Sequence, residues 1–206
     1  MNPLSTIKGT ITAGVVIAIV IALIVAVLAK TGIAFNTPSF IMWLHVGAGI
    51  TWIGMLYYFN FVQVPALAAA AADQGGPGGA GISKYVAPRA LLWFRWGAVF
   101  TWLTGVGYLA HIQLLGPAFM LGFGTGGSLP ATYIGIGAWL GTIMLFNVWV
   151  LIWPNQKKIL GLVEATAQEI AKARRVAFLA SRTNTMLSIP MLMSMVSFGH
   201  AGFFIN

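Results

Sequence analysis

Histidine is the residue type whose spacing in this chain most clearly suggests chemistry. The sequence has three histidines, His45, His111 and His200, and each lies in a separate long apolar stretch. An ionisable side chain inside a membrane helix is energetically expensive, so it is expected to have a function or a fixed partner. Imidazole is also a common ligand of haem iron and other transition metals. These three residues are therefore the first candidates for a cofactor site.

The composition places these histidines in an integral membrane protein. Hydrophobic residues make up 59% of the 206 residues, whereas Asp, Glu, Lys and Arg make up 7%. Soluble domains have about 25% charged residues. The net charge of +8 comes from so few charges that it indicates membrane topology rather than nucleic-acid binding. Cysteine is absent, which excludes disulfides, iron–sulfur clusters and covalent c-type haem attachment.

Five apolar stretches have the length of about 20 residues that a transmembrane helix needs. We therefore predict an all-α fold, a single membrane domain with a bundle of five transmembrane helices. The predicted spans are residues 11–29, 39–61, 91–115, 132–153 and 180–204. Basic residues are concentrated on the side of the N-terminus, so the positive-inside rule predicts a cytoplasmic N-terminus and a periplasmic C-terminus. Residues 155–178 are predicted to form a cytoplasmic amphipathic helix, lying on the membrane surface or docked on a partner.

This topology places all three histidines near the outer ends of their helices. At 1.5 Å per residue, each histidine would lie roughly 6–9 Å from the helix end. Two imidazoles at matching depth on facing helices can ligate one haem b. Gly49 lies one turn from His45, and Gly107 lies one turn from His111, so both glycines are expected to give a flat macrocycle room.

Two other interpretations of the histidines stay open. Copper is one, because Met191, Met193 and Met195 precede His200, although a spacing of two residues spreads the thioethers around the helix and favours packing. In the other interpretation the histidines only form hydrogen bonds between helices and no cofactor binds. Three histidines at one depth favour haem over both alternatives.

Polar residues gather at the opposite, cytoplasmic end of the predicted bundle. Arg95 and Arg182 lie at the starts of the third and fifth spans, and Asn60, Gln63 and Asn147 lie at the ends of the second and fourth. Such a cluster could bind a haem propionate, a quinone headgroup or an anionic substrate. It could equally satisfy its own hydrogen bonds and extend to the lipid headgroups.

Two kinds of enzyme chemistry have little support in the sequence. The acidic residues are Asp73, Glu164 and Glu169, all in predicted cytoplasmic loops, so a carboxylate-driven proton pump or a Ser-His-Asp hydrolase is not expected. Residues 122–127 match the GxGxxG pattern, but they lie between two membrane helices rather than in a βαβ unit. We interpret them as a loop.

Several blocks of the sequence resemble the N-terminal membrane domain of bacterial urate hydroxylases, the urate oxidase N-terminal family. The blocks include Leu-His-Val-Gly-Ala-Gly at 44–49, Asn-Phe-Val-Gln at 60–63, Trp-Phe-Arg-Trp at 93–96, and the segments 101–105, 147–156 and 182–191. His45 and His200 lie in regions that match the family, whereas His111 lies beyond them.

The resemblance implies a respiratory-chain oxidoreductase in the bacterial inner membrane that passes electrons to a cytochrome c. Full-length family members end in a cytochrome c domain with a Cys-x-x-Cys-His motif. This sequence has no cysteine and stops at Asn206. We therefore expect a short stand-alone form whose electron acceptor is a separate chain.

The leading hypothesis is a b-type-cytochrome-like electron-transfer subunit with haem b near the outer face. His45 and His200 would be the axial ligands, His111 an alternative ligand, and a periplasmic cytochrome c the redox partner. An alternative is a cofactor-free accessory subunit of a larger complex such as a terminal oxidase, favoured by the GxxxG spacing of Gly137 and Gly141. A third hypothesis is a membrane hydroxylase of urate or another small molecule, with Arg95 and Arg182 holding an anion. All three place the chain in a lipid bilayer, and none involves nucleic acid.

Overall fold

The backbone is helical over most of its length. The computed structural model describes residues 2–30, 32–124, 126–200 and 202, and none of these residues forms a strand. The predicted all-α fold is therefore confirmed. The chain divides into two units, Met1–Thr37 and Pro38–Asn206.

The first unit contains the helix α1 (Ile7–Leu28), preceded by a 3-10 turn, η1 (Pro3–Ser5). Thr6 caps the helix, because its Oγ1 accepts a hydrogen bond from the Gly9 N–H at 3.0 Å. The structure describes every residue of α1, and none of them is buried. A helix that is apolar all round is typical of a membrane span.

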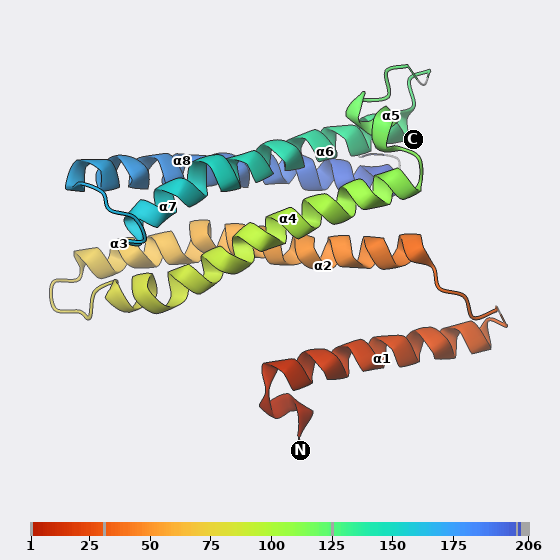
Figure 1. Cartoon of the computed structure of the whole chain (residues 1–206), viewed down its shortest axis with the longest axis horizontal. Helices are drawn as coiled ribbons and strands as arrows, with labels where there is room; N and C mark the ends of the chain where they lie inside the picture. Colours follow the sequence, from red (N-terminus) through yellow and green to blue (C-terminus); the bar gives the residue numbers. More distant parts are fainter. Residues whose placement is uncertain (1, 31, 125, 201, 203–206) are drawn as a thin grey trace. The chain divides into compact units, whose positions relative to one another are not determined.

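The second unit is a bundle of long helices (Figure 1). Its elements are α2 (Thr37–Tyr57), η2 (Tyr58–Gln63), α3 (Val64–Ala72), η3 (Ile82–Val86), α4 (Ala87–His111), α5 (Leu115–Phe119), α6 (Leu129–Phe146), η4 (Asn147–Ile152), α7 (Trp153–Ile159) and α8 (Ala167–His200). The segments η2, η3 and η4 are π-helical. Each is continuous with the α-helix that follows it, so the second predicted span is part of one helical run from α2 to α3.

Among the residues that the structure describes, three helical runs are long and apolar enough to cross a membrane: Ile7–Leu28, Thr37–Ala72 and Leu129–Ile159. They correspond to the first, second and fourth predicted spans, and they indicate a multi-pass membrane protein. The helices α4 and α8 are also long, at 25 and 34 residues. Arg95 in α4 and Arg182 with several other polar residues in α8 lower the mean hydropathy of these two helices.

Four long helices contact one another in the ring order α2, α4, α6, α8. Gly97 of α4 allows α2 to approach closely, since a Cβ atom there would lie 3.2 Å from the backbone nitrogen of Trp52. The Trp102 indole of α4 donates a hydrogen bond to Thr142 Oγ1 of α6 at 2.9 Å. α6 packs along α8 (Figure 1). The Tyr57 hydroxyl of α2 closes the ring with a hydrogen bond to Ser188 Oγ of α8 at 3.0 Å.

The segment 155–178, predicted as one amphipathic helix, is divided between α7 and α8. Gly161 ends α7 with a φ of 70°, a left-handed conformation that glycine adopts without steric cost. Thr166 and Glu169 then begin α8 with a capping box. A Glu169 carboxylate oxygen accepts from the Thr166 N–H at 2.8 Å, and the Glu169 N–H donates to Thr166 Oγ1 at 3.3 Å. The helix-ending Gly161 and the capping box at Thr166 therefore divide the segment into two helices, although its amphipathic pattern is continuous.

Candidate functional site

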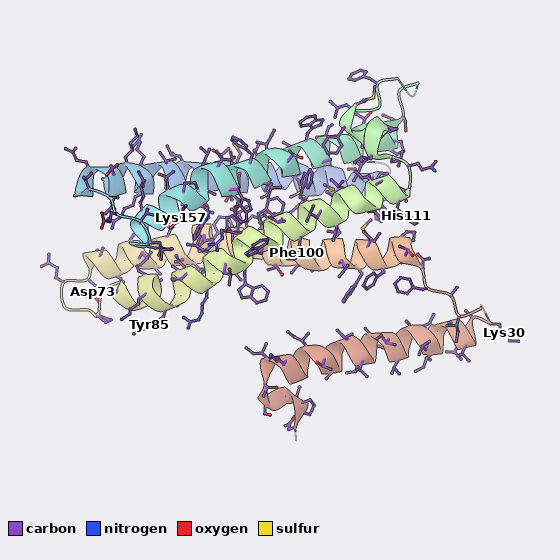
Figure 2. All side chains as sticks on the ribbon, viewed as in Figure 1. Lys30, Asp73, Tyr85, Phe100, His111 and Lys157 are labelled. Atoms are coloured by element: carbon purple, nitrogen blue, oxygen red, sulfur yellow. The ribbon has the colours of Figure 1, made fainter. Side chains whose placement is uncertain are left out.

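A cavity of about 550 Å³ lies inside the second unit, between α2, α4, α5, α6 and α8. Its lining includes residues between 42 and 54 of α2 and residues of the second half of α4, the half that ends at His111 (Figure 2). Most lining side chains are apolar. Five glycines contribute backbone to the walls: Gly49, Gly54, Gly105, Gly137 and Gly141. The cavity has a size and polarity typical of a small-molecule or cofactor site.

His45 is the histidine that lines this cavity. Its Nδ1 lies 2.8 Å from the backbone carbonyl oxygen of Thr101 in α4. Because a carbonyl oxygen can only accept, the proton of the neutral imidazole is on Nδ1, and Nε2 keeps its lone pair. A hydrogen bond of this kind from one ring nitrogen is what orients metal-ligating histidines.

Gly105 makes room for the imidazole of His45. A Cβ atom at Gly105 would lie 2.9 Å from His45 Cε1 and 3.1 Å from Nδ1, too close for a side chain. A hydrogen bond to Thr101 thus holds the ring against α4, and Gly105, one turn further along the helix, leaves the space that the ring occupies. Gly107, which was predicted to make room beside His111, does not line the cavity and has open space beside it. The predicted Gly49 does line the cavity.

Sequence reasoning missed Gly105 because it placed the cavity face of α4 two residues too far along. His111 and Gly107 were assigned to one face on their spacing of four residues. The residues of α4 that reach the cavity are Thr101, Trp102, Gly105, Val106, Tyr108 and Leu109. Gly105 lies in the block 101–105, which resembles the urate oxidase N-terminal family. This resemblance is the sequence feature that could have indicated Gly105.

His111 and His200 are both exposed and do not line the cavity. His111 is the last residue of α4, and His200 is the last residue of α8. The Nδ1 of His200 lies 3.1 Å from the carbonyl oxygen of Val196 in its own helix. His45, by contrast, lies about 12 Å along α2 from its first residue. Among the described residues, no group of three His, Asp or Glu side chains could hold a metal ion.

The two predicted arginines lie outside the cavity, and each contacts an aromatic ring. The guanidinium carbon of Arg95 lies 3.5 Å from the ring centroid of Trp153 in α7. The guanidinium carbon of Arg182 lies 5.2 Å from the ring centroid of Phe178, one turn earlier in α8. These are cation–π contacts, although the buried Nε of Arg95 has no hydrogen-bond partner.

The asparagines of the cytoplasmic cluster hold α8 against its neighbours. Asn147 donates to Asn184 Oδ1 at 2.8 Å, and Asn184 donates to the carbonyl oxygen of Met144 at 3.0 Å. Asn60 donates to Ser181 Oγ at 2.8 Å and to the carbonyl oxygen of Leu56 at 2.9 Å. Asn60 and Asn147 lie in η2 and η4, and π-helical turns disturb the regular pairing of backbone carbonyls. The amides therefore satisfy carbonyls beside the two π segments while joining three helices.

Comparison with known proteins identifies one part of the chain. Residues 127–205 match the family model described as urate oxidase N-terminal. This range contains α6, η4, α7 and α8, and it confirms the sequence resemblance for that part of the chain. No curated protein and no solved structure matches the chain.

Proposed function

We propose that this membrane protein, whose residues 127–205 match the urate oxidase N-terminal family, is a b-type-cytochrome-like electron-transfer subunit. The observation that carries the proposal is His45, which lines an apolar cavity of about 550 Å³ with Nδ1 bonded to Thr101 and Nε2 free. We assign His45 Nε2 as an axial ligand of haem b bound in this cavity. The redox partner that we propose is a periplasmic cytochrome c.

The residues around His45 suit a flat, mostly apolar cofactor. Gly49 on one side of the cavity and Gly141 on the other leave the backbone bare where a porphyrin would approach it. The Thr101 carbonyl fixes the tautomer of His45 and makes its Nε2 a better electron donor to a metal. Haem b, when bound, supplies a one-electron redox centre. The protein's part is to hold and orient the ligand and to exclude water from the cavity.

The proposed topology has five spans in the bacterial inner membrane, with the cytoplasmic N-terminus that the charge distribution predicts. Tyr85, Asp73 and Lys157 lie at the end of the bundle opposite His111 (Figure 2). The basic residues near Tyr85 and Lys157 favour the cytoplasm for that end. The cavity end would then face the periplasm, which places His45 within reach of a soluble electron carrier.

The competing interpretations have weaker support in the structure. Gly137 and Gly141, whose spacing favoured an accessory subunit, both line the cavity and do not form an outward face for another subunit. Arg95 and Arg182, the predicted anion clamp of a hydroxylase, contact separate aromatic rings outside the cavity. The cavity around His45 therefore supports the electron-transfer function best.

The test is the haem content of two histidine variants of the full chain, purified in detergent. His45→Ala removes the cavity ligand, and we expect it to abolish bound haem. His111→Ala, which removes an exposed imidazole outside the cavity, is the matched control and should keep the wild-type haem content. Equal haem in both variants, or copper rather than haem in the folded wild type, would overturn the proposal.

A further inference from the structure

The proposed haem site has one histidine, so a six-coordinate haem iron would take its second protein ligand from another side chain of the cavity or from one brought in from outside. The other soft donor groups that line the cavity are the thioethers of Met42, Met191 and Met195. A thioether is a recognised partner of histidine in haem ligation. The question is which of the three lies on the face opposite His45.

The ring order of the helices separates the three methionines. His45 lies at the contact between α2 and α4, where its ring meets Thr101 and Gly105. Met42 belongs to α2, three residues before His45, and so comes from the same side of the cavity. Met191 and Met195 belong to α8, one turn apart, and α8 meets α6 on the side opposite the contact between α2 and α4.

Met195 lies directly at the contact between α6 and α8. A Cβ atom at Gly137 of α6 would lie 3.0 to 3.4 Å from three side-chain atoms of Met195, including 3.2 Å from Sδ. The two sides of the cavity are therefore built alike, each with a side chain packed over a glycine of the neighbouring helix. His45 packs over Gly105 between α2 and α4, and Met195 packs over Gly137 between α6 and α8.

Cross-helix hydrogen bonds show which methionine is level with His45. Tyr57 bonds to Ser188, so twelve residues back along α2 to His45 correspond to twelve residues forward along α8, to position 200. Asn60 bonds to Ser181, and fifteen residues back from Asn60 to His45 correspond to fifteen residues forward from Ser181, to position 196. Met195 lies next to the second of these two positions, whereas Met191 lies about 6 Å deeper. The exposed His200 reaches the right level, but it does not line the cavity.

We propose that the Sδ of Met195 is the second axial ligand of the haem iron, opposite Nε2 of His45. This inference rests on the proposed haem site and specifies its ligand set. Methionine is flexible and its sulfur is polarisable, so the side chain can turn from Gly137 towards a bound ring. Histidine–methionine ligation raises the reduction potential relative to ligation by two histidines. It also gives ferric haem a weak sulfur-to-iron charge-transfer band at the border of the visible and the near-infrared, which ligation by two histidines lacks.

The experiment compares variants of the purified full chain by near-infrared absorption, redox titration and carbon monoxide binding. In Met195→Leu we expect loss of the charge-transfer band and fast carbon monoxide binding to the ferrous form. Met195→His should restore a six-coordinate low-spin spectrum at a lower midpoint potential. Met193→Leu, which changes an exposed methionine on the same helix, and His200→Ala should both keep the wild-type spectrum and potential.

The outcomes separate this inference from the proposed function. A folded wild-type protein without haem overturns both. Haem that keeps its band in Met195→Leu, or loses its low-spin spectrum in His200→Ala, overturns the Met195 assignment alone. If Met195→Leu loses its haem, recovery of low-spin haem in Met195→His supports the assignment, and failure to recover it contradicts the assignment.

Discussion

One hydrogen bond decides the chemistry that His45 can offer. The bond from its Nδ1 to the Thr101 carbonyl commits the proton to one nitrogen and leaves Nε2 as a base or a metal ligand. His200 forms a comparable bond within its own helix, but it lies at an exposed helix end. The difference between the two residues is therefore the surrounding cavity rather than the side chain itself.

Gly105 gives a residue-scale prediction. In Gly105→Ala, the new methyl group would lie 2.9 Å from His45 Cε1, so the ring must move away from Thr101. Overpacking of this kind costs about 1–3 kcal/mol, which corresponds to a roughly five- to 150-fold weakening of haem binding. Gly107→Ala adds the same methyl group to the same helix where nothing lies within 4 Å. Haem titration of both variants should show weaker binding in Gly105→Ala alone, and equal affinities would contradict the role given to Gly105.

Asn184 gives a second prediction, on stability. It is fully buried, and Asn184→Ala would leave the Asn147 side-chain amide without its partner. It would also remove one of the two hydrogen bonds to the Met144 carbonyl, which still accepts from the Asn147 backbone N–H. An unpaired buried group costs about 1–3 kcal/mol and a lost hydrogen bond about 1 kcal/mol, so we expect a loss of roughly 2–4 kcal/mol in the free energy of unfolding. Asn155→Ala removes a single bond within one helix and should cost about 1 kcal/mol. Denaturant unfolding in mixed micelles measures both, and a smaller loss in Asn184→Ala than in Asn155→Ala would contradict this account.

At the scale of whole elements, the beginning of α8 depends on the charge of Glu169. Hydrogen bonds from the Thr166 N–H and hydroxyl, together with Lys158 at 3.6 Å, hold the pKa of Glu169 below its ordinary value. A group with a lowered pKa in the folded state contributes stability above its ordinary pKa. This contribution is lost as the pH falls through the folded-state pKa.

We therefore expect the first turn of α8 to fray in acid. Amide hydrogen-exchange protection factors for residues 167–170 should fall as the pH drops below the ordinary pKa range of a glutamate. In Glu169→Gln, the pH dependence should disappear, because the side chain no longer titrates. Glu164→Gln removes the same charge from the loop outside the capping box and should leave the pH dependence intact. Protection that ignores pH in the wild type would show that the capping carboxylate does not stabilise this turn.

The sequence predicted which segments are helical better than it predicted which side of each helix faces the cavity. Apolar length located three runs that can cross a membrane, and the start and stop signals at Thr166 and Gly161 were visible in principle. The inward faces were harder to assign, because a membrane helix is apolar both towards lipid and towards the protein core. This is why the spacing from His111 indicated Gly107, whereas the glycine of α4 that lines the cavity is Gly105. The π segments also lack a sequence signal, although Asn60 and Asn147 mark two of them after the fact.

At the scale of the whole molecule, the histidine that lines the cavity and the basic residues belong to opposite ends of the second unit. The orientation of these two ends in the membrane matters for the proposed function, because a periplasmic electron carrier can reach only the end that faces the periplasm. The absence of cysteine makes the orientation directly testable, since any introduced cysteine is the single thiol in the chain. Ser83 and His111 are exposed positions at the two ends.

We expect Ser83→Cys to be protected from a membrane-impermeant maleimide in intact cells whose outer membrane has been permeabilised, and His111→Cys to be labelled. Both should be labelled after the inner membrane is disrupted, which controls for thiol reactivity. The reverse pattern would place the cavity on the cytoplasmic side and would exclude a periplasmic cytochrome c as the partner.

The central claim is that the cavity around His45 binds haem, and a reduced-minus-oxidised visible spectrum of the purified full chain tests it most directly. The account predicts a b-type spectrum with about one haem per chain, as one cavity with one iron-facing imidazole requires. A folded, monodisperse preparation that remains colourless after incubation with haem would contradict it. His45 would then be a structural residue of an apolar cavity, with no role in electron transfer.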